Sequence, residues 1–281
     1  MPELPEVETI VRGLRQKLSK SKIAKVSVLD PRILTKVSAQ KFIHGLVGRK
    51  IVSIARRAKY IILELSDKNI LLVHLGMTGG LIFKNAGRRG QGNPPRVAYP
   101  KFTKWFARFR DGSHLYYIDA RLFGEIRLTD AKHIADLNLR LGPEPLSKDF
   151  KFDEFFAKLQ KRKTNIKSLL LNQQFLSGVG NIYATEALFL AGISPLRRAD
   201  RLKKTEARKL FDSIKKVLLL GIKHRGTTVD SYVDAEGRAG GFQSKLKVYG
   251  RGGEKCFRCG ATIKRITLGQ RGTYYCPGCQ R

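Results

Sequence analysis

The amino-acid sequence predicts an α+β protein with three parts: a β-rich N-terminal domain that begins with a helix, a helical domain, and a small metal-binding module. Three observations carry this prediction. Short β-type runs fill residues 22–130, helical periodicity dominates residues 152–224, and all four cysteines lie in the last 26 residues. A chain of 281 residues is long enough for two domains that each bury a core.

The first expected element is a helix that starts near Pro5. Apolar residues recur there with the spacing of one helix face, at Val7, Ile10, Val11, Leu14 and Leu18. A proline suits the first turn of a helix, where its missing N–H is not needed. The carboxylates of Glu3, Glu6 and Glu8 therefore lie together at the front of a helix.

Residues 22–130 read as an antiparallel β domain. The apolar runs 61–65 and 70–75 flank a four-residue turn signal and predict a hairpin, and further strands are expected at 26–29, 115–118 and 125–128. Strands joined by short turns are typical of an antiparallel sandwich or barrel. Residues 85–98 form a basic, Gly- and Pro-rich loop that we expect to be flexible.

The stretch 141–148 contains two prolines and predicts a linker after a first domain at 1–140. A helical domain at 149–242 follows, with helices expected at 152–160, 166–172, 182–191 and about 203–224, and with a Gly-rich loop at 225–242. Residues 243–281 form the third part.

The charge of the chain points to a polyanionic partner. Lys and Arg number 55 and Asp and Glu 23, which gives a formal charge of +32. Nucleic acid is the first candidate partner and an anionic membrane surface the second. No apolar run approaches the roughly 20 residues that span a bilayer, and the acidic, Pro-broken start is unlike a signal peptide. We therefore expect a cytoplasmic protein without a membrane anchor.

The four cysteines form two Cys-x-x-Cys pairs, Cys256 with Cys259 and Cys276 with Cys279, separated by 16 residues. This spacing predicts one tetrahedral Zn²⁺ with four thiolate ligands, which is a structural site because no position is open for water. A redox dithiol and two disulfides are the alternatives. Residues 255–281 contain six Lys and Arg residues and no acidic residue. A zinc ion with four thiolates has a charge of −2, so the segment carries an excess of positive charge. We therefore expect phosphate contact, with Arg271 near a hairpin tip; a solvated basic face is the alternative.

The N-terminus offers nucleophilic chemistry. If Met1 is removed, the nitrogen of Pro2 becomes a secondary amine, and an α-amino group titrates near ~7.7–8.0. Attack on a sugar C1′ gives a cationic iminium that favours elimination of the 3′ phosphate, and Glu3 and Glu6 are placed to transfer protons. On composition alone an ordinary Met-Pro start is the commoner case, because acidic residues there often complement a helix dipole.

Six segments together resemble a known family: Met1–Thr9, Arg56–Tyr60, His74–Gly79, Asp119–Gly124, Gly178–Ala184 and the cysteine ribbon with Gln270–Thr273. In this order they are similar to bacterial formamidopyrimidine-DNA glycosylase. The resemblance implies an N-terminal antiparallel β-sandwich with an N-terminal helix, a helix–two-turns–helix domain and a β-hairpin zinc finger. It also implies a bifunctional glycosylase and abasic-site lyase of base excision repair that excises oxidised purines, such as 8-oxoguanine and formamidopyrimidines, by β,δ-elimination.

The resemblance also implies roles for individual residues. Pro2 is the expected Schiff-base nucleophile, Glu3 the acid that opens the sugar ring, and Lys59 and Arg271 assist the two eliminations and hold phosphate. Glu6 joins this catalytic group. Taken singly, Lys59 reads as a solvated strand lysine.

The DNA contacts implied by the resemblance are carried by Asn181, Lys163, Tyr249, His74 and a trio, Met77, Arg121 and Phe123, that fills the gap left by a flipped base. Each residue of the trio also has a structural alternative, as a core side chain for Met77 and Phe123 and as an ion-pair partner of Asp119 for Arg121. Asn181 fits a helix cap equally well. His74 fits an ordinary strand histidine. A histidine segment usual in the family's β domain reads Lys101-Phe102-Thr103-Lys104 here, so we assign no contact there.

Two other functions compete with this prediction. An endonuclease VIII-like enzyme would act on oxidised pyrimidines, and a damage-sensing protein would bind DNA without catalysis. Leu4 and the Met77 trio favour the purine branch, and the presence of Pro2 with Glu3 argues against a binding protein. The expected partner is double-stranded DNA that contains oxidised bases or abasic sites, bound by a monomer.

Overall fold

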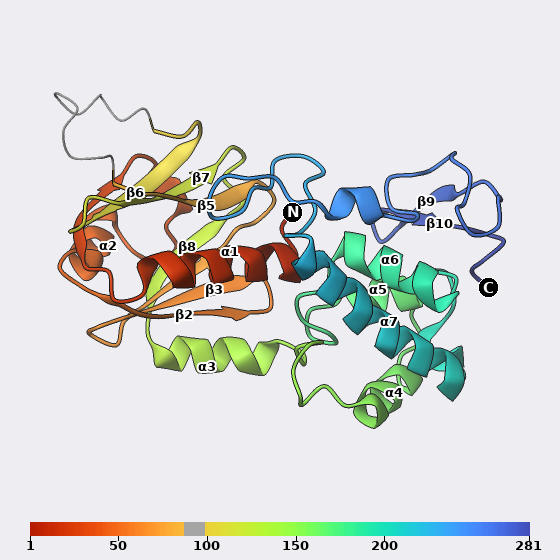
Figure 1. Cartoon of the computed structure of the whole chain (residues 1–281). Coiled ribbons are helices and arrows are strands. Elements are labelled where there is room, and N and C mark those ends of the chain that lie inside the picture. Colours follow the sequence, from red (N-terminus) through yellow and green to blue (C-terminus); the bar gives the residue numbers. More distant parts are fainter. Residues whose placement is uncertain (87–98) are drawn as a thin grey trace. The chain divides into compact units, whose positions relative to one another are not determined.

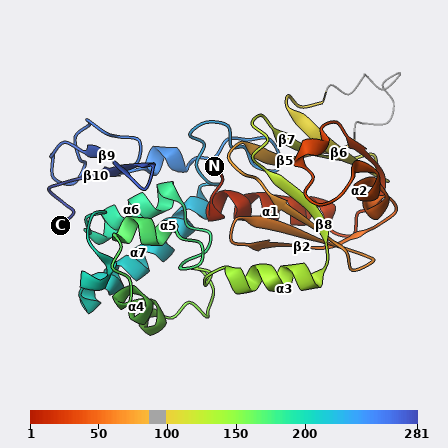
Figure 2. The same cartoon turned by 180° about the vertical axis from the view of Figure 1, so that it is seen from behind.

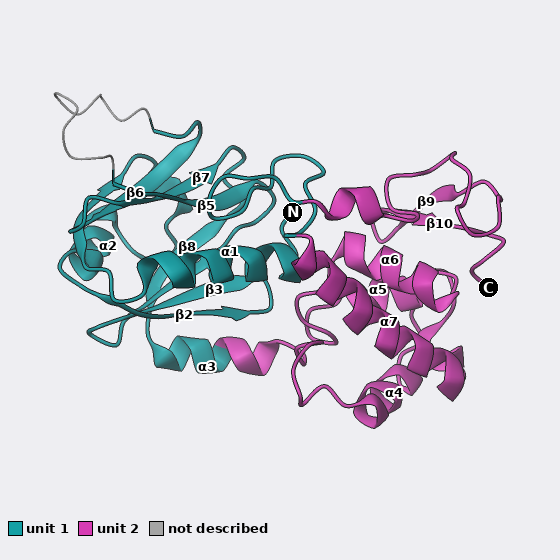
Figure 3. Ribbon diagram, in the orientation of Figure 1, with its two compact units in different colours: residues 1–136, 225–240 teal, residues 137–224, 241–281 magenta. Residues whose placement is uncertain are grey.

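The computed structural model describes residues 1–86 and 99–281, so most of the loop expected at 85–98 lies outside the described residues. The chain divides into two compact units (Figure 3). Unit 1 contains residues 1–136 and 225–240, and unit 2 contains residues 137–224 and 241–281. Within the described residues no helix has the length and apolar character needed to cross a membrane.

Unit 1 is built from two four-stranded antiparallel sheets. One sheet has the strand order β1 (Ile23–Val28), β6 (Thr103–Phe109), β7 (His114–Asp119), β5 (Gly79–Lys84), and the other has the order β2 (Ile51–Arg57), β3 (Tyr60–Leu65), β4 (Ile70–His74), β8 (Glu125–Thr129). Buried residues from both sheets form a single core, so the β domain is a sandwich and not a barrel. The predicted hairpin is confirmed as the antiparallel pair β3–β4.

The helix predicted at the N-terminus is confirmed as α1 (Leu4–Leu18). All five residues of its predicted apolar stripe are fully buried in the core of the sandwich. Both views show α1 lying alongside the sheet that contains β2 and β3 (Figures 1 and 2). The guanidinium of Arg15 donates a hydrogen bond to the backbone oxygen of Ile54 in β2, at 2.5 Å, which fixes the helix to the strand.

Two helices of the β-rich region were not predicted. The first, α2 (Ala39–Leu46), begins at an N-cap Ser38 whose side chain accepts a hydrogen bond from the backbone of Lys41, and it follows a short 3₁₀ helix, η1 (Pro31–Ile33). The second, α3 (Ala131–Arg140), buries none of its residues.

Unit 2 contains the predicted helices, each within two residues of the expected bounds: α4 (Phe152–Gln160), α5 (Ile166–Leu171), α6 (Asn181–Ala191) and α7 (Lys204–Lys223). Short 3₁₀ helices occur at η2 (Ala199–Arg201) and η3 (Phe242–Lys245). Helices α6 and α7 approach closely at Gly221, where a Cβ atom would lie 2.5 Å from the ring of Tyr183. This glycine is therefore required by the packing of the two helices.

The C-terminal part of unit 2 carries the predicted hairpin, β9 (Lys264–Leu268) with β10 (Arg271–Tyr275). Gly269 and Gln270 join the two strands, and both have positive φ angles, of 51° and 60°. Two residues of positive φ between paired strands are the signature of a type I′ turn, which matches the twist of the strands. Arg271 is the first residue after this turn.

The segment 225–240, which the sequence grouped with the helical domain, lies in unit 1. Its residues Tyr232 and Ala235 are part of the sandwich core, and the backbone oxygen of Ala235 accepts a hydrogen bond from Phe83 in β5 at 2.7 Å. The segment therefore returns from the end of α7 to complete the first unit. The division between the units falls at residues 136 and 137, close to the boundary expected after residue 140.

Candidate active site and zinc centre

The N-terminal residues of unit 1 are held by the carboxylate of Glu6. One of its oxygens accepts the backbone N–H of Glu3 at 2.8 Å, and the other accepts the backbone N–H of Thr227 at 2.7 Å. Pro2, Glu3 and Glu6 are all buried. The hydrogen bond to Glu3 fixes the backbone directly after Pro2, so the residue expected to supply the amine has a defined position.

Lys59 lies in the tight turn between β2 and β3 and is only 7% exposed, which excludes the alternative of a solvated strand lysine. The preceding residue, Ala58, has a φ of 52°, and its backbone oxygen accepts a hydrogen bond from Arg56 at 3.1 Å. Arg56 also pairs with Glu8 near the start of α1, at 2.9 Å. The turn that carries Lys59 is thereby fixed to the same end of α1 as Pro2 and Glu3.

His74 ends strand β4 directly opposite Tyr60, and the two rings lie 4.8 Å apart. Its Nδ1 accepts the backbone N–H of Gly76 at 3.3 Å, which implies the Nε2–H tautomer. Burial, and then the positive charge of Lys59, lower the pKa of His74. The ring is therefore neutral near pH 7 and shapes the turn that follows it.

The carboxylate of Asp119 organises the two loops that carry the expected gap-filling trio. It is fully buried and accepts hydrogen bonds from the hydroxyl of Thr78 at 2.5 Å, from the backbone of Arg121 at 3.1 Å and from the backbone of Gly124 at 2.8 Å. A Cβ atom on Gly76 would lie 2.2 Å from the backbone oxygen of Phe123. The loop that contains Met77 therefore contacts the loop that contains Arg121 and Phe123.

The side chains of this trio reach outward from the sandwich. Phe123 is 54% exposed, so it is not an ordinary core aromatic, and Met77 is half-buried. The guanidinium of Arg121 lies over the ring of Phe123 at 4.6 Å, and Asp119 accepts its backbone N–H. A thioether, a cation and an aromatic face on one rigid pair of loops can fill the space left by an extruded base.

In unit 2 the side chain of Asn181 lies in a buried network. Its Oδ1 accepts a hydrogen bond from the ammonium of Lys167 at 2.6 Å, and its Nδ2 donates to the backbone oxygen of Gly272 in β10 at 3.0 Å. Lys167 also lies 3.5 Å from the hydroxyl of Thr273. The N-cap of α6 is Gly180, so Asn181 is not the helix cap that its position allowed. This network joins α5, α6 and the zinc hairpin.

The other three residues of unit 2 that we expect to contact DNA differ in exposure and in their partners. Arg271 is exposed beside the hairpin turn, and Lys163 is exposed in the loop before α5. Tyr249 donates its backbone N–H to the buried carboxylate of Glu186 at 2.8 Å, and its ring packs edge-on against Tyr274 at 5.3 Å. Lys167, and not Lys163, is the lysine of segment 161–167 that contacts Asn181.

The four cysteines form the predicted metal centre. Their four sulfur atoms all lie within 4.8 Å of one another, and two of the Sγ–Sγ distances are 3.3 Å (Cys259 to Cys276) and 3.9 Å (Cys256 to Cys279). A tetrahedral zinc with Zn–S bonds of about 2.3 Å requires sulfur atoms roughly 3.8 Å apart. The backbone N–H of Arg258 donates to the sulfur of Cys256 at 3.4 Å. The donor set therefore fits one structural Zn²⁺ that holds the hairpin.

Comparison with known proteins agrees with the fold and with the zinc centre. Three family models match the chain: "Formamidopyrimidine-DNA glycosylase N-terminal domain" at residues 1–126, "Formamidopyrimidine-DNA glycosylase H2TH domain" at residues 141–233, and "Zinc finger found in FPG and IleRS" at residues 253–281. The formamidopyrimidine-DNA glycosylases of Herpetosiphon aurantiacus and Heliobacterium modesticaldum are 44% and 45% identical to the chain, with full coverage of both sequences.

Solved structures of the Lactococcus lactis protein are also similar. Its complex with DNA that contains an abasic site has a TM-score of 0.89 at 36% identity and covers 99% of each chain. Its complex with DNA that contains Fapy-dG has a TM-score of 0.88 at 35% identity and covers 99% of this chain and 100% of that one.

The sandwich, the helix–two-turns–helix domain and the zinc finger define a DNA glycosylase of base excision repair. A formamidopyrimidine-DNA glycosylase that is 44% identical over the full length of the chain identifies the family within this class. The chain belongs to the formamidopyrimidine-DNA glycosylase family.

Three residues that organise the site were not selected from the sequence. The sequence predicts Asp119 only as an ion-pair partner of Arg121, and it assigns no role to Glu186. In segment 161–167 it favours Lys163 over Lys167. One signal was available for Lys167, because Asn165 is a good N-cap and places Lys167 inside the helix that follows. Glu186 is a carboxylate within an otherwise apolar helix, a pattern that indicates a buried polar contact.

Proposed function

We propose that this protein excises oxidised purines from double-stranded DNA and then cleaves the resulting abasic site, with the nitrogen of Pro2 as the nucleophile. The observation that carries this proposal is the hydrogen bond from the backbone N–H of Glu3 to the buried carboxylate of Glu6. It immobilises the N-terminus beside two buried carboxyl groups in a chain of net charge +32. The same hydrogen bond belongs to the capping box that starts α1, and the burial of both carboxyl groups directly after Pro2 favours catalysis over DNA binding alone.

The proposed reaction begins once Met1 has been removed. The secondary amine of Pro2 attacks C1′ of the damaged nucleoside, the bond from C1′ to the base breaks, and the base leaves with the proton of the amine. Glu3 gives a proton to the ring oxygen as the sugar opens to an iminium. The carboxylate left on Glu3 then accepts the acidified C2′ proton as the 3′ phosphate leaves, and loss of a second proton, from C4′, to solvent expels the 5′ phosphate. Lys59 and Arg271 neutralise the charge of these phosphates.

The remaining site residues bind the DNA in two ways, by filling the duplex gap and by contacting phosphates. Met77, Arg121 and Phe123 fill the gap in the duplex, and His74 holds the loop of Met77 in place. Asn181 and Tyr249 contact the phosphate backbone, which positions the duplex without reading its sequence, and Lys167 orients Asn181. We further propose that the protein acts as a monomer on DNA in the bacterial cytoplasm, where its zinc thiolates stay reduced; light scattering after size-exclusion chromatography tests the monomer.

Borohydride trapping tests the proposed reaction, because reduction of the iminium leaves protein and DNA covalently linked. The expected result is a trapped adduct with a duplex that carries 8-oxoguanine opposite cytosine, and mass spectrometry should locate the adduct on the N-terminal peptide. Pro2→Gly should abolish efficient trapping while DNA affinity changes little. Pro5→Gly is the matched control, because it changes the same residue type three positions away without touching the amine.

The alternatives predict different results in the same assay. An adduct with a thymine-glycol duplex and none with the 8-oxoguanine duplex would assign the protein to oxidised pyrimidines. Binding without an adduct on any oxidised or abasic duplex would assign it to non-catalytic damage sensing. Equal loss of trapping in Pro2→Gly and Pro5→Gly would contradict the nucleophilic role of Pro2.

A further inference from the structure

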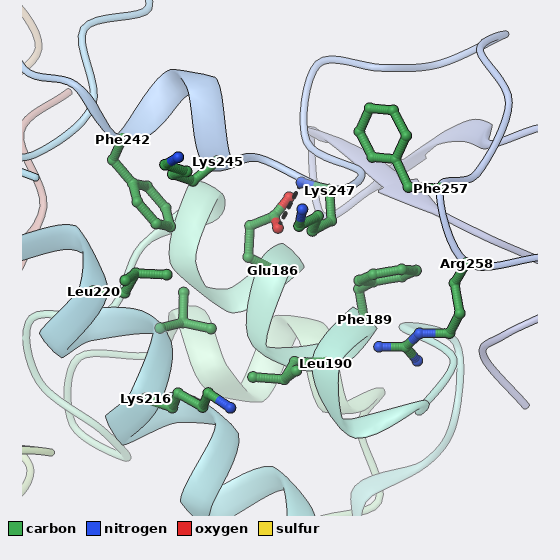
Figure 4. Close-up of a pocket in the computed structure, with 11 residues that line it drawn as sticks. Glu186, Phe189, Leu190, Lys216, Leu220, Phe242, Lys245, Lys247, Phe257 and Arg258 are labelled. Atoms are coloured by element: carbon green, nitrogen blue, oxygen red, sulfur yellow. Dashed lines mark hydrogen bonds between the residues drawn. The ribbon is translucent and has the colours of Figure 1, made fainter.

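Unit 2 contains a cavity of about 430 Å³ between α6, α7, η3 and the first cysteine pair of the zinc finger (Figure 4). Its inner surface is apolar and is formed by Phe189, Leu190, Val217, Leu220 and Phe242. A volume of this size lies within the range of roughly 300–1,000 Å³ typical of binding pockets. None of the residues that line the cavity is placed in catalysis, in direct DNA contact or among the zinc ligands, although Glu186 holds the backbone of Tyr249 and the backbone of Arg258 contacts the sulfur of Cys256.

Positive charges surround this apolar surface. The side chains of Lys216, Lys245, Lys247 and Arg258 line the cavity, and Figure 4 shows them on different sides of it. The guanidinium of Arg258 is held over the ring of Phe189 at 4.5 Å. These four cations favour a ligand that carries negative charge next to an apolar group.

The single carboxylate in the lining, that of Glu186, is already engaged in the fold. Its two oxygens accept the backbone N–H groups of Lys247, Val248 and Tyr249 at 2.8–2.9 Å. The cavity therefore offers cations to an incoming anion, and the carboxylate of Glu186 is already hydrogen-bonded to the backbone.

Phe257 adds an exposed aromatic ring to the lining of the cavity. It is 70% exposed, although the guanidinium of Arg251 stacks on it at 3.6 Å. Arg251 is itself fixed, because it donates hydrogen bonds to the backbone oxygens of Lys247 and Lys255 at 2.7 and 2.9 Å. An aromatic ring held rigidly in water beside an apolar cavity has the character of a binding hot spot.

We propose that this surface docks a short acidic segment of a partner protein, which inserts one bulky apolar side chain into the cavity and pairs its carboxylates with Lys216, Lys245, Lys247 and Arg258. A peptide fits better than duplex DNA, because DNA offers phosphates but no apolar side chain to fill the cavity. A peptide can also cover the exposed ring of Phe257 in the lining. The docking surface goes beyond the proposed repair reaction and does not depend on it.

Selection from a displayed library of random decapeptides tests the proposal on the full-length, zinc-loaded protein. The expected result is enrichment of sequences that place two or more acidic residues beside a Leu, Phe or Trp. Fluorescence anisotropy of one enriched, labelled peptide should then show at least a tenfold weaker Kd for Lys216→Glu and for Leu220→Ser. Two matched controls should bind normally: Lys209→Glu on the same helix, and Leu196→Ser at another exposed leucine of unit 2.

Three results would overturn the proposal. The first is an absence of enrichment, or enrichment of peptides without acidic residues. The second is binding that Lys216→Glu weakens no more than Lys209→Glu does. The third is a loss of affinity for undamaged duplex that is larger in Lys216→Glu than in Lys209→Glu, which would assign these cations to the DNA backbone. Displacement of the peptide by decanoate is expected, because both ligands would place an apolar group in the same cavity.

Discussion

The ammonium of Lys167 lies 2.6 Å from the side-chain oxygen of Asn181, and both groups are enclosed by α5, α6 and the zinc hairpin. This contact fixes the orientation of the Asn181 amide, since only the oxygen can accept from an ammonium. The amide nitrogen donates to the backbone oxygen of Gly272. We therefore propose for this buried lysine a positioning role through Asn181 and no direct contact with DNA.

Replacing Lys167 by Met should weaken duplex binding by about 1–2 kcal/mol, because Asn181 loses a charged hydrogen-bond partner. Lys163→Met removes an exposed lysine four residues earlier and is the matched control, with an expected loss of less than about 0.5 kcal/mol. Fluorescence anisotropy with an abasic-site duplex measures both. A larger loss in Lys163→Met would return the role to the lysine first chosen from the sequence.

Replacing Glu6 by Gln should lower stability by about 1–3 kcal/mol, because one amide oxygen cannot hold both the Glu3 and the Thr227 backbone N–H groups. Cleavage should slow while the shape of its pH dependence stays the same, since Glu6 positions the N-terminus. Glu64→Gln, at an exposed carboxylate of β3, is the control. A shifted limb in the pH–rate profile of Glu6→Gln would show instead that Glu6 transfers protons.

Replacing Arg271 by Ala should weaken DNA binding and reduce the slope of log Kobs against log salt by about one. The residue follows the type I′ turn directly, so its charge stands at the tip of a rigid hairpin. Titrations at several salt concentrations give the slope, and Arg281→Ala, at another exposed arginine of the finger, should leave it unchanged. An unaltered slope for Arg271→Ala would remove the phosphate contact.

Loss of zinc should disorder the finger and abolish tight DNA binding, because the hairpin that carries Arg271 is held by the four thiolates. Cys276→Ser, at a buried ligand, should reduce the zinc content measured by atomic emission to well below one ion per chain. DNA affinity should fall further than in Arg271→Ala, since Gly272 and Thr273 also lose their contacts with Asn181 and Lys167. Full affinity in the zinc-free protein would contradict a structural role for the metal.

The stability of the protein should decrease as the pH falls below about 6.5, in part through His74. Its pKa is lowered in the folded state, so the unfolded chain binds the proton more readily and unfolding is favoured once this histidine can be protonated. Urea unfolding between about pH 5 and 7.5 should show a flatter profile for His74→Gln than for the native protein. The control is His44→Gln, at an exposed histidine. If both variants follow the native profile, His74 does not contribute.

The fold was predictable where the sequence carries a strong period or a fixed spacing. The stripe of α1, the β3–β4 hairpin, the helices of unit 2 and the cysteine pairs all have such a signal. Helix α2 was missed because eight residues show little more than two turns of periodicity, and α3 was missed because it buries nothing.

The site was predictable at the level of motifs but not of contacts. The resemblance supplied Pro2, Lys59 and Arg271, yet no pattern could show that residue 227 returns to the carboxylate of Glu6. For the same reason the choice between Lys163 and Lys167 needed the structure. Contacts between residues more than 200 positions apart leave no local trace in a single sequence.

The return of segment 225–240 to the sandwich also has a consequence for synthesis on the ribosome. The core of unit 1 includes Tyr232 and Ala235, so the N-terminal domain cannot close until more than four-fifths of the chain has been made. Glu6 meets its Thr227 partner only at that stage. The N-terminal amine therefore reaches its defined position late, when the helices that follow the sandwich have already emerged. The last contacts of the sandwich core therefore form only when the chain is nearly complete.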